Sequence, residues 1–192
     1  MSWIKQINYE NADPQLRKLY DSVKAPENSP DNIIKVHSLR PHTLSGHLSL
    51  YKNVLHHAAN TLPRWYLETI GVYVSALNGC DYCVAHHAEG VRKNSADEND
   101  AEKIIECLQQ GKPENFFNGF FLEGLIYAKI LTLSPAAILK QNIQKLQHAG
   151  FSDGEILEIN QVCAYFNYAN RTVLGLGVEL KGDVLGFSPN DV

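Results

Sequence analysis

Residues 68–92 read ETIGVYVSALNGCDYCVAHHAEGVR, a run that resolves into two helical segments. Apolar side chains recur every three or four residues before Asn78, which is the spacing of one helix face. The dipeptide Asn78-Gly79 interrupts this pattern and is expected to cap and end the first helix. A second helix is expected from about Cys80 to about Lys93. The Cys-x-x-Cys pair therefore falls at the start of a helix.

The rest of the chain has the same helical spacing. Ser95–Glu98 and Ser152–Glu155 have the capping-box pattern, in which a serine hydroxyl and a glutamate carboxylate satisfy opposite free amides. Ser134-Pro135 is expected to start another helix. No long run alternates with period two, as a strand would. We therefore expect an all-α fold of about eight helices, followed by an irregular tail from Gly175.

The composition restricts the class of protein. A chain of 192 residues is expected to form one domain over residues 1–192, and 44% hydrophobic against 20% charged residues is typical of a globular chain. The 17 Lys and Arg residues against 21 Asp and Glu give a net charge of −4, which argues against a nucleic-acid-binding protein. The N-terminal segment lacks the pattern of a signal peptide, and no apolar run is long enough to cross a membrane. A cytoplasmic location is therefore expected.

The second helix carries residues that are suited to redox chemistry. Residues three or four apart are neighbours on a helix, so Cys80 and Cys83 can approach to disulfide distance, and Cys83 lies beside His87. A helix N-terminus stabilises a thiolate, and a neighbouring imidazole can accept the thiol proton. Glu68 on the preceding helix is the natural carboxylate to orient His87, because the helix break lets the chain fold back.

Each of these residues also has an ordinary structural interpretation. A lone Cys-x-x-Cys can be incidental, His87 can be a surface or core histidine, and Glu68 can be a solvated helix residue. A zinc site would need further ligands, but Cys107 and Cys163 stand alone and no second Cys or His pair has the usual spacing, so no metal is expected. A thioredoxin-like site needs a strand before its Cys-x-x-Cys, whereas helices are expected on both sides here.

The spacing of these residues is more specific than Cys-x-x-Cys alone. It runs E-x11-C-x2-C-x3-H-x4-R from Glu68 to Arg92, and it resembles the signature of the alkylhydroperoxidase D-like branch of the carboxymuconolactone decarboxylase superfamily. The run FNYANR at residues 166–171 is typical of the peroxidase-related members of that branch. The likeness extends from about residue 10 to about residue 180.

The resemblance implies a role for each residue of this group. Cys83 would be the peroxidatic cysteine, Cys80 the resolving cysteine, and His87 with Glu68 a proton relay through water. The helix dipole favours Cys80 as the nucleophile, whereas proximity to a general base favours Cys83. We follow the second reason, which agrees with the family. Tyr82 stands where some members have a relay histidine, which predicts a shorter relay and modest turnover.

The resemblance also implies the assembly and the partners. It implies an all-helical bundle that forms homo-oligomeric trimers or hexamers. It implies a thiol peroxidase, without a bound cofactor, that reduces small hydroperoxides and is itself reduced by a thioredoxin-like or lipoyl dithiol. Two alternatives stay open: a redox-sensing oligomer with low turnover, and a lactone decarboxylase, which would need no cysteine pair.

The remaining polar and aromatic residues have structural interpretations. Arg92 is expected to pair with a carboxylate, and Cys107 and Cys163 are expected to be inert core thiols. A phenylalanine stripe is expected in the core or a subunit interface, with one ring available to line a peroxide pocket: Phe116, Phe117, Phe120 and Phe121. Five histidines are interpreted as ordinary polar positions: His37, His42, His47, His56 and His57.

Overall fold

The computed structural model describes residues 2–23 and 30–186, and the regular elements within these ranges are all helices, which confirms the all-α prediction. Nine are α-helices in the described part, against the eight or so expected. There are also three short 3-10 helices in the described part, one before α1 at Tyr9–Asn11 and two between α-helices at Pro113–Asn115 and Pro135–Ala137. The α-helices are α1 Pro14–Asp21, α2 Asn32–Lys35, α3 Pro41–Leu55, α4 Arg64–Leu77, α5 Asp81–Asn94, α6 Glu98–Gln109, α7 Gly119–Leu133, α8 Lys140–Ala149 and α9 Asp153–Leu176.

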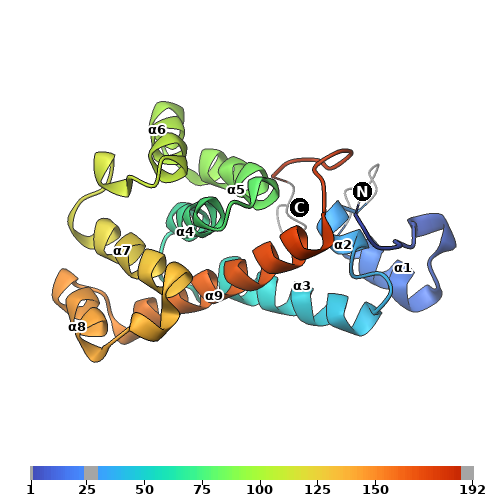
Figure 1. The fold of residues 1–192 in the computed structure, drawn as a ribbon, viewed down its shortest axis with the longest axis horizontal. Coiled ribbons are helices and arrows are strands. Elements are labelled where there is room, and N and C mark those ends of the chain that lie inside the picture. Colours follow the sequence, from blue (N-terminus) through green and yellow to red (C-terminus); the bar gives the residue numbers. More distant parts are fainter. Residues whose placement is uncertain (1, 24–29, 187–192) are drawn as a thin grey trace.

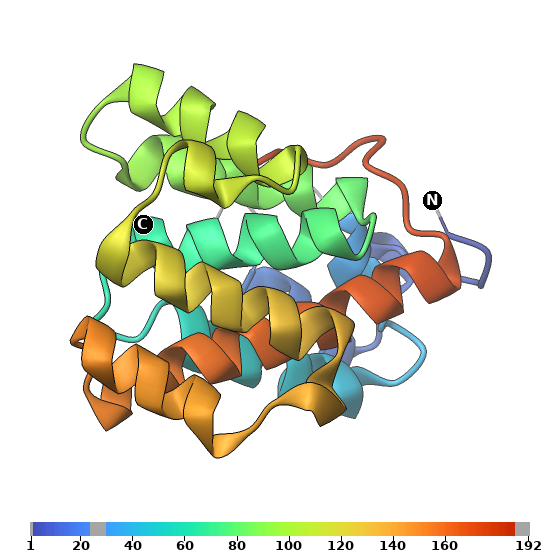
Figure 2. The ribbon, with the colours of Figure 1, turned by 60° about the vertical axis from the view of Figure 1, so that its left-hand side comes forward.

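Helix α4 lies at the centre of the main core. Its residues from Tyr66 to Ser75 are all buried, because α5, α6, α7 and α9 pack around it (Figures 1 and 2). Gly71 permits the close approach of α9, since a Cβ atom there would clash with the ring of Phe166. Asn78 is the C-cap of α4, and Gly79 has a φ of 66°, so the predicted helix break is confirmed.

Helix α9 is the longest element and crosses most of the molecule. It begins with the predicted capping box, in which the amide of Glu155 donates to the Ser152 hydroxyl and the Ser152 amide donates to the Glu155 carboxylate, at 3.2 and 2.8 Å. It ends at Gly177, which has a φ of 60°. This 24-residue helix contacts both α3 and α4, so it joins the N-terminal helices to the main core.

A second, smaller core is formed by α1, α2 and the first half of α3. Leu16 and Tyr20 from α1 pack there against Ile34, Leu44 and Leu48. This cluster meets the main core along α3, which contacts α1, α4 and α9. A third small cluster holds Cys80 and Cys83 together with Val36, Val173 and Val178, and the functional site described below lies where the clusters meet.

Two predicted helix starts are wrong. Ser95 is the C-cap of α5, and Asp97 caps α6 instead, because its carboxylate accepts hydrogen bonds from two free backbone amides of the first turn. Ser134-Pro135 starts only a short 3-10 helix, and α8 begins at Lys140. There the Asn142 side chain accepts from the Leu139 amide at 2.9 Å, which satisfies one amide at the helix start.

The tail after α9 is irregular, as predicted, although the helix itself continues to Leu176. The tail returns across the molecule towards α5 (Figure 1). The Asp183 carboxylate accepts hydrogen bonds from the Asn32 amide at 2.9 Å and from the Tyr82 hydroxyl at 2.5 Å. The tail therefore ties α2 to α5. Across residues 2–23 and 30–186, none of the helices combines the length and apolarity needed to cross a membrane.

Candidate active site

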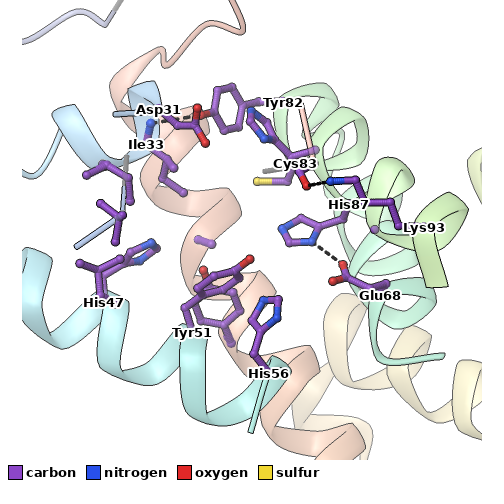
Figure 3. Close-up of a pocket in the computed structure, with 18 of the residues that line it drawn as sticks. Asp31, Ile33, His47, Tyr51, His56, Glu68, Tyr82, Cys83, His87 and Lys93 are labelled. Carbon is purple, nitrogen blue, oxygen red and sulfur yellow. Dashed lines mark hydrogen bonds and ion pairs between the residues drawn. The ribbon is translucent and has the colours of Figure 1, made fainter. Parts of the chain in front are cut away.

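A cavity of about 90 Å³ lies between α3, α5 and α9, where the two cores meet (Figure 3). Glu68, Cys83 and His87 line it from α4 and α5. His47 and Tyr51 line it from α3, on the other side. Further lining residues come from the α2 region, α9 and the tail, among them Asp31, Ile33, Ile34, Tyr165, Ala169 and Gly186.

The two cysteines of the Cys-x-x-Cys pair are buried neighbours. Cys80 is the N-cap of α5 and is fully buried, whereas Cys83 lies in the first turn and lines the cavity. Both are free thiols. The Cys83 thiol donates a hydrogen bond to the Cys80 sulfur, and this hydrogen bond is the main cause that lowers the pKa of Cys80. The same hydrogen bond, together with burial, raises the pKa of Cys83.

Asn170 from α9 completes the surroundings of the pair. Its side chain is fully buried, and its hydrogen bonds to the thiols of Cys80 and Cys83 act to lower the pKa of both. Two other side chains hold the amide: it donates to Ser75 Oγ at 3.0 Å and accepts from Asn78 Nδ2 at 2.9 Å. The sequence did not predict a role for Asn170. Its only signal was its place in the FNYANR run of residues 166–171.

His87 and Glu68 form the second pair of the site. The His87 Nδ1 atom lies 2.7 Å from Glu68 Oε2, so the predicted contact between them is confirmed. The Glu68 side chain is 4% exposed, which excludes its interpretation as a solvated helix residue. Gly90 makes room for it, because a Cβ atom there would lie 2.5 Å from the carboxylate carbon of Glu68. The ring of Phe166 meets the His87 ring edge-on, with the centroids 4.5 Å apart.

Cys83 and His87 face the same cavity, but no hydrogen bond between described residues joins them. Cys83 and His87 therefore share a cavity, as expected of neighbours on one helix, but they are not joined by a direct hydrogen bond. A proton that passes between them needs an intervening molecule, such as a water or a bound substrate. Catalytic hydrogen bonds of this kind are commonly longer in an unliganded site.

Tyr82 and His86 point away from this pair and towards the tail. The Tyr82 hydroxyl donates to Asp183 and accepts from the Ile33 amide at 3.1 Å, and His86 Nε2 lies 3.5 Å from Asp183 Oδ2. Burial raises the pKa of the adjacent Asp31 to about 6, with His86 opposing this effect and Asp183 adding to it. Tyr82 thus anchors the tail and takes no part in the Glu68–His87 contact.

Two histidines that were interpreted as ordinary polar positions line the cavity, so that interpretation is wrong for them. His47 is 4% exposed, and burial lowers its pKa to about 3. His56 follows the end of α3 and packs against the ring of Tyr51. The sequence feature that indicates burial of His47 is its place on the apolar face of α3, three residues after Leu44 and next to Leu48.

The other predicted positions are structural. Arg92 pairs with Glu89 and Glu102, as expected of a carboxylate partner. Cys107 and Cys163 are buried in the main core, and burial raises the pKa of both, that of Cys107 to about 11. The four phenylalanines pack in or against that core, and the expectation that one would line the pocket is wrong. Over the described ranges, no group of three or more His, Cys, Asp or Glu side chains is arranged to hold a metal ion.

Comparison with known proteins gives a match to a family model over part of the chain and a fold. Residues 43–119 match the model of the carboxymuconolactone decarboxylase family. No curated protein matches the chain. Among solved structures, an alkylhydroperoxidase AhpD core described as an uncharacterized peroxidase-related protein from Ralstonia eutropha JMP134 is 18% identical, with a TM-score of 0.80 over 94% of this chain and 92% of that one.

Two further structures are similar. A peroxidase-related protein from Silicibacter sp. TM1040 is 23% identical, with a TM-score of 0.77 over 93% of this chain and 91% of that one. The debrominase Bmp8 is 20% identical, with a TM-score of 0.71 over 88% of this chain and 87% of that one. At these identities the likeness establishes a shared fold, and chemistry has to be argued from the site.

Proposed function

We propose that this chain, whose residues 43–119 match the carboxymuconolactone decarboxylase family model and whose fold is AhpD-like, is a thiol-dependent peroxidase that reduces small organic hydroperoxides. One observation carries the proposal. A reduced cysteine pair reaches a cavity through Cys83, and the hydrogen-bonded pair of His87 and Glu68 lines the same cavity. A nucleophile, a base and an orienting carboxylate that share one small cavity are the parts that thiol chemistry needs.

Attack by Cys83 is the first step. His87, oriented by Glu68, accepts the Cys83 proton through a water or the bound peroxide. The thiolate sulfur attacks one peroxide oxygen, so that an S–O bond forms and the O–O bond breaks. The released alkoxide takes the proton back from His87 and leaves as the alcohol. The sulfur has lost two electrons, the peroxide has gained them, and Cys83 is left as a sulfenic acid.

Cys80 then resolves the sulfenic acid. Its sulfur attacks the Cys83 sulfur, an S–S bond forms, and the hydroxyl group leaves as water with the Cys80 proton. The lowered pKa of Cys80 supports this role, because a larger thiolate fraction favours attack. A dithiol of a thioredoxin-like or lipoyl protein supplies two electrons and two protons, which restore both thiols. No bound cofactor takes part in this scheme.

The proposal includes the expected assembly and location. We propose a single domain over residues 1–192 that forms a homo-oligomer, a trimer or hexamer, in the cytoplasm. Helix α7 supports a subunit contact, because Ile126 and Leu133 on it are 39% and 53% exposed. Light scattering behind size-exclusion chromatography measures the number of subunits.

Turnover tests the proposal and separates it from the two alternatives. The full chain, tert-butyl hydroperoxide and a lipoyl or thioredoxin-like dithiol should consume peroxide over many cycles. A redox sensor would form the Cys80–Cys83 disulfide once, with no further consumption. A lactone decarboxylase would act without the cysteine pair, so its activity would survive Cys83→Ser. Either result would contradict the proposal.

A further inference from the structure

The wall of the cavity opposite Cys83 carries a polar group that the proposed mechanism does not use. His47 from α3 is 4% exposed, and its imidazole is directed into the cavity (Figure 3). Its Nδ1 atom is buried and has no hydrogen-bond partner among the described residues. The rings of His37 and Tyr165 pack against it, with centroids 4.8 and 5.7 Å away, and hold it in this orientation. A molecule in the cavity can therefore satisfy Nδ1.

The charge of His47 restricts what that molecule can be. Burial, with a smaller effect from neighbouring His37, lowers the pKa of His47 to about 3, so the imidazole is neutral at physiological pH. A neutral imidazole nitrogen donates or accepts one hydrogen bond according to its tautomer. It offers a carboxylate or phosphate no opposite charge. A neutral hydroxyl or carbonyl group is the suitable partner.

The lining of the cavity as a whole is more apolar than polar, although it also includes charged side chains such as Arg64, Glu68 and Lys93. Ile33, Leu48, Tyr51 and Ala169 contribute to it. A cavity that holds benzene measures roughly 150 Å³, whereas this one measures about 90 Å³. The cavity therefore suits a short, branched aliphatic body better than an aromatic one.

We propose that His47 is a substrate-binding residue, which recognises a neutral hydroxyl or carbonyl group on a short aliphatic hydroperoxide whose peroxide end lies at Cys83. This inference rests on the proposed function, because that function places the peroxide at Cys83. It adds a second recognition point, at the opposite end of the substrate. It also accounts for a buried polar atom that the protein itself leaves without a partner.

Two substrates that differ by one hydroxyl test the inference. They are tert-pentyl hydroperoxide and its derivative with a hydroxyl on the terminal ethyl carbon. One hydrogen bond to a buried group predicts a kcat/KM about fivefold to tenfold higher for the hydroxylated substrate. His47→Phe keeps a ring but removes Nδ1, so the ratio should fall to about one. His47→Asn places a polar atom near the position of Nδ1 and should restore part of the preference.

His37→Phe is the matched control. The His37 ring contacts His47 but does not line the cavity, and its two nitrogens lie 2.8 Å from the Ile33 carbonyl oxygen and 3.4 Å from the Tyr168 hydroxyl. The ratio between the two substrates should persist in this variant. A ratio that falls equally in His37→Phe and His47→Phe would indicate a packing effect and overturn the inference.

Binding of the redox-inert products separates this inference from the proposed function. These products are tert-pentyl alcohol and the corresponding diol, whose Kd values calorimetry measures on the full chain. Tighter diol binding that His47→Phe abolishes supports recognition by His47, even if no hydroperoxide is turned over. Equal turnover of both hydroperoxides with equal binding of both alcohols would overturn the inference and leave the peroxidase proposal standing.

Discussion

The chain has two sets of buried cysteines that differ in their surroundings. Cys80 and Cys83 are 0% and 3% exposed, and Cys107 and Cys163 are 5% and 0% exposed, so burial does not distinguish the sets. Only Cys80 has a lowered pKa, whereas the pKa values of Cys83, Cys107 and Cys163 are raised. The Cys107 thiol donates to the Ile104 carbonyl oxygen, which does not stabilise a thiolate, and burial dominates its pKa. Cys80 accepts a hydrogen bond from a second thiol, and this outweighs the effect of burial on its pKa.

Access to the cavity is the second difference between the two sets. Cys83 lines the cavity that the His87–Glu68 pair shares, whereas Cys107 and Cys163 lie in the main core. A buried thiol is therefore expected to react only where a donor, a base and a path for the substrate coincide. Variants that remove these parts one at a time test this expectation.

Removal of the attacking sulfur has the largest expected effect. Cys83→Ser should lower peroxide turnover by about three orders of magnitude, because no other thiol lines the cavity within the described ranges. Cys107→Ser is the control, since its hydroxyl can keep the hydrogen bond to Ile104. Steady-state turnover with tert-butyl hydroperoxide measures both. Equal losses in the two variants would contradict the distinction between the sets.

Removal of the carboxylate behind His87 has the next largest effect. Glu68→Gln keeps the size of the side chain but removes the charge that orients and stabilises a protonated imidazole. We expect kcat/KM to fall by about a hundredfold, within the range of general acid–base contributions. Glu102→Gln, which alters a surface pair with Arg92, should stay close to the wild-type value. Activity of Glu68→Gln within twofold of the wild type would remove Glu68 from the relay.

Displacement of the same carboxylate should have a smaller effect. In Gly90→Ala the new Cβ atom meets the flexible end of Glu68, so the carboxylate is expected to move away from His87 at little cost in stability. We expect kcat/KM to fall by about tenfold, with a change in unfolding free energy within about 1 kcal/mol. Gly175→Ala, which has open space around its Cβ position, is the control for helix propensity. Full activity in Gly90→Ala would show that the spacing between α4 and α5 has no catalytic role.

Loss of the amide that contacts both thiols has the smallest effect. Asn170→Ala removes hydrogen bonds that lower the pKa of Cys80 and Cys83, so both pKa values should rise. At neutral pH the thiolate fraction falls, and alkylation by iodoacetamide should slow by about fivefold, with its pH profile displaced to higher pH. Asn167→Ala, which lies on the same helix and contacts Cys163, is the control. An unchanged profile in Asn170→Ala would assign Asn170 to packing alone.

The sequence predicts the part of the site that follows from local geometry. Cys83 and His87 lie on α5, Cys80 is its N-cap, and Glu68 lies on the helix before it. Helical spacing and the helix break between α4 and α5 therefore suffice to bring these residues together. The rest of the cavity comes from segments far along the chain. His47 on α3 lines the cavity and Asn170 on α9 contacts the two thiols only because helices distant in the sequence pack together there.

The helix boundaries also show that sequence patterns predict local contacts better than contacts that depend on competing or distant residues. The capping box at Ser152 was predicted correctly, because its two hydrogen bonds involve residues three apart. The capping box predicted at Ser95 was wrong, because Asp97 competes for the same free amides and its carboxylate accepts hydrogen bonds from two of them. Tyr82 could not be interpreted from its neighbours, since its partner Asp183 lies 101 residues away.

Trapping of the first oxidised sulfur tests the central claim most directly. Cys80→Ser and Cys83→Ser proteins receive one equivalent of tert-butyl hydroperoxide in the presence of dimedone, and peptide mass spectrometry locates the adduct. We predict a dimedone adduct at Cys83 in the Cys80→Ser protein, with release of one equivalent of tert-butyl alcohol, and no adduct at Cys80 in the Cys83→Ser protein. An adduct at Cys80 formed at the same rate, or no adduct in either protein, would contradict attack by Cys83.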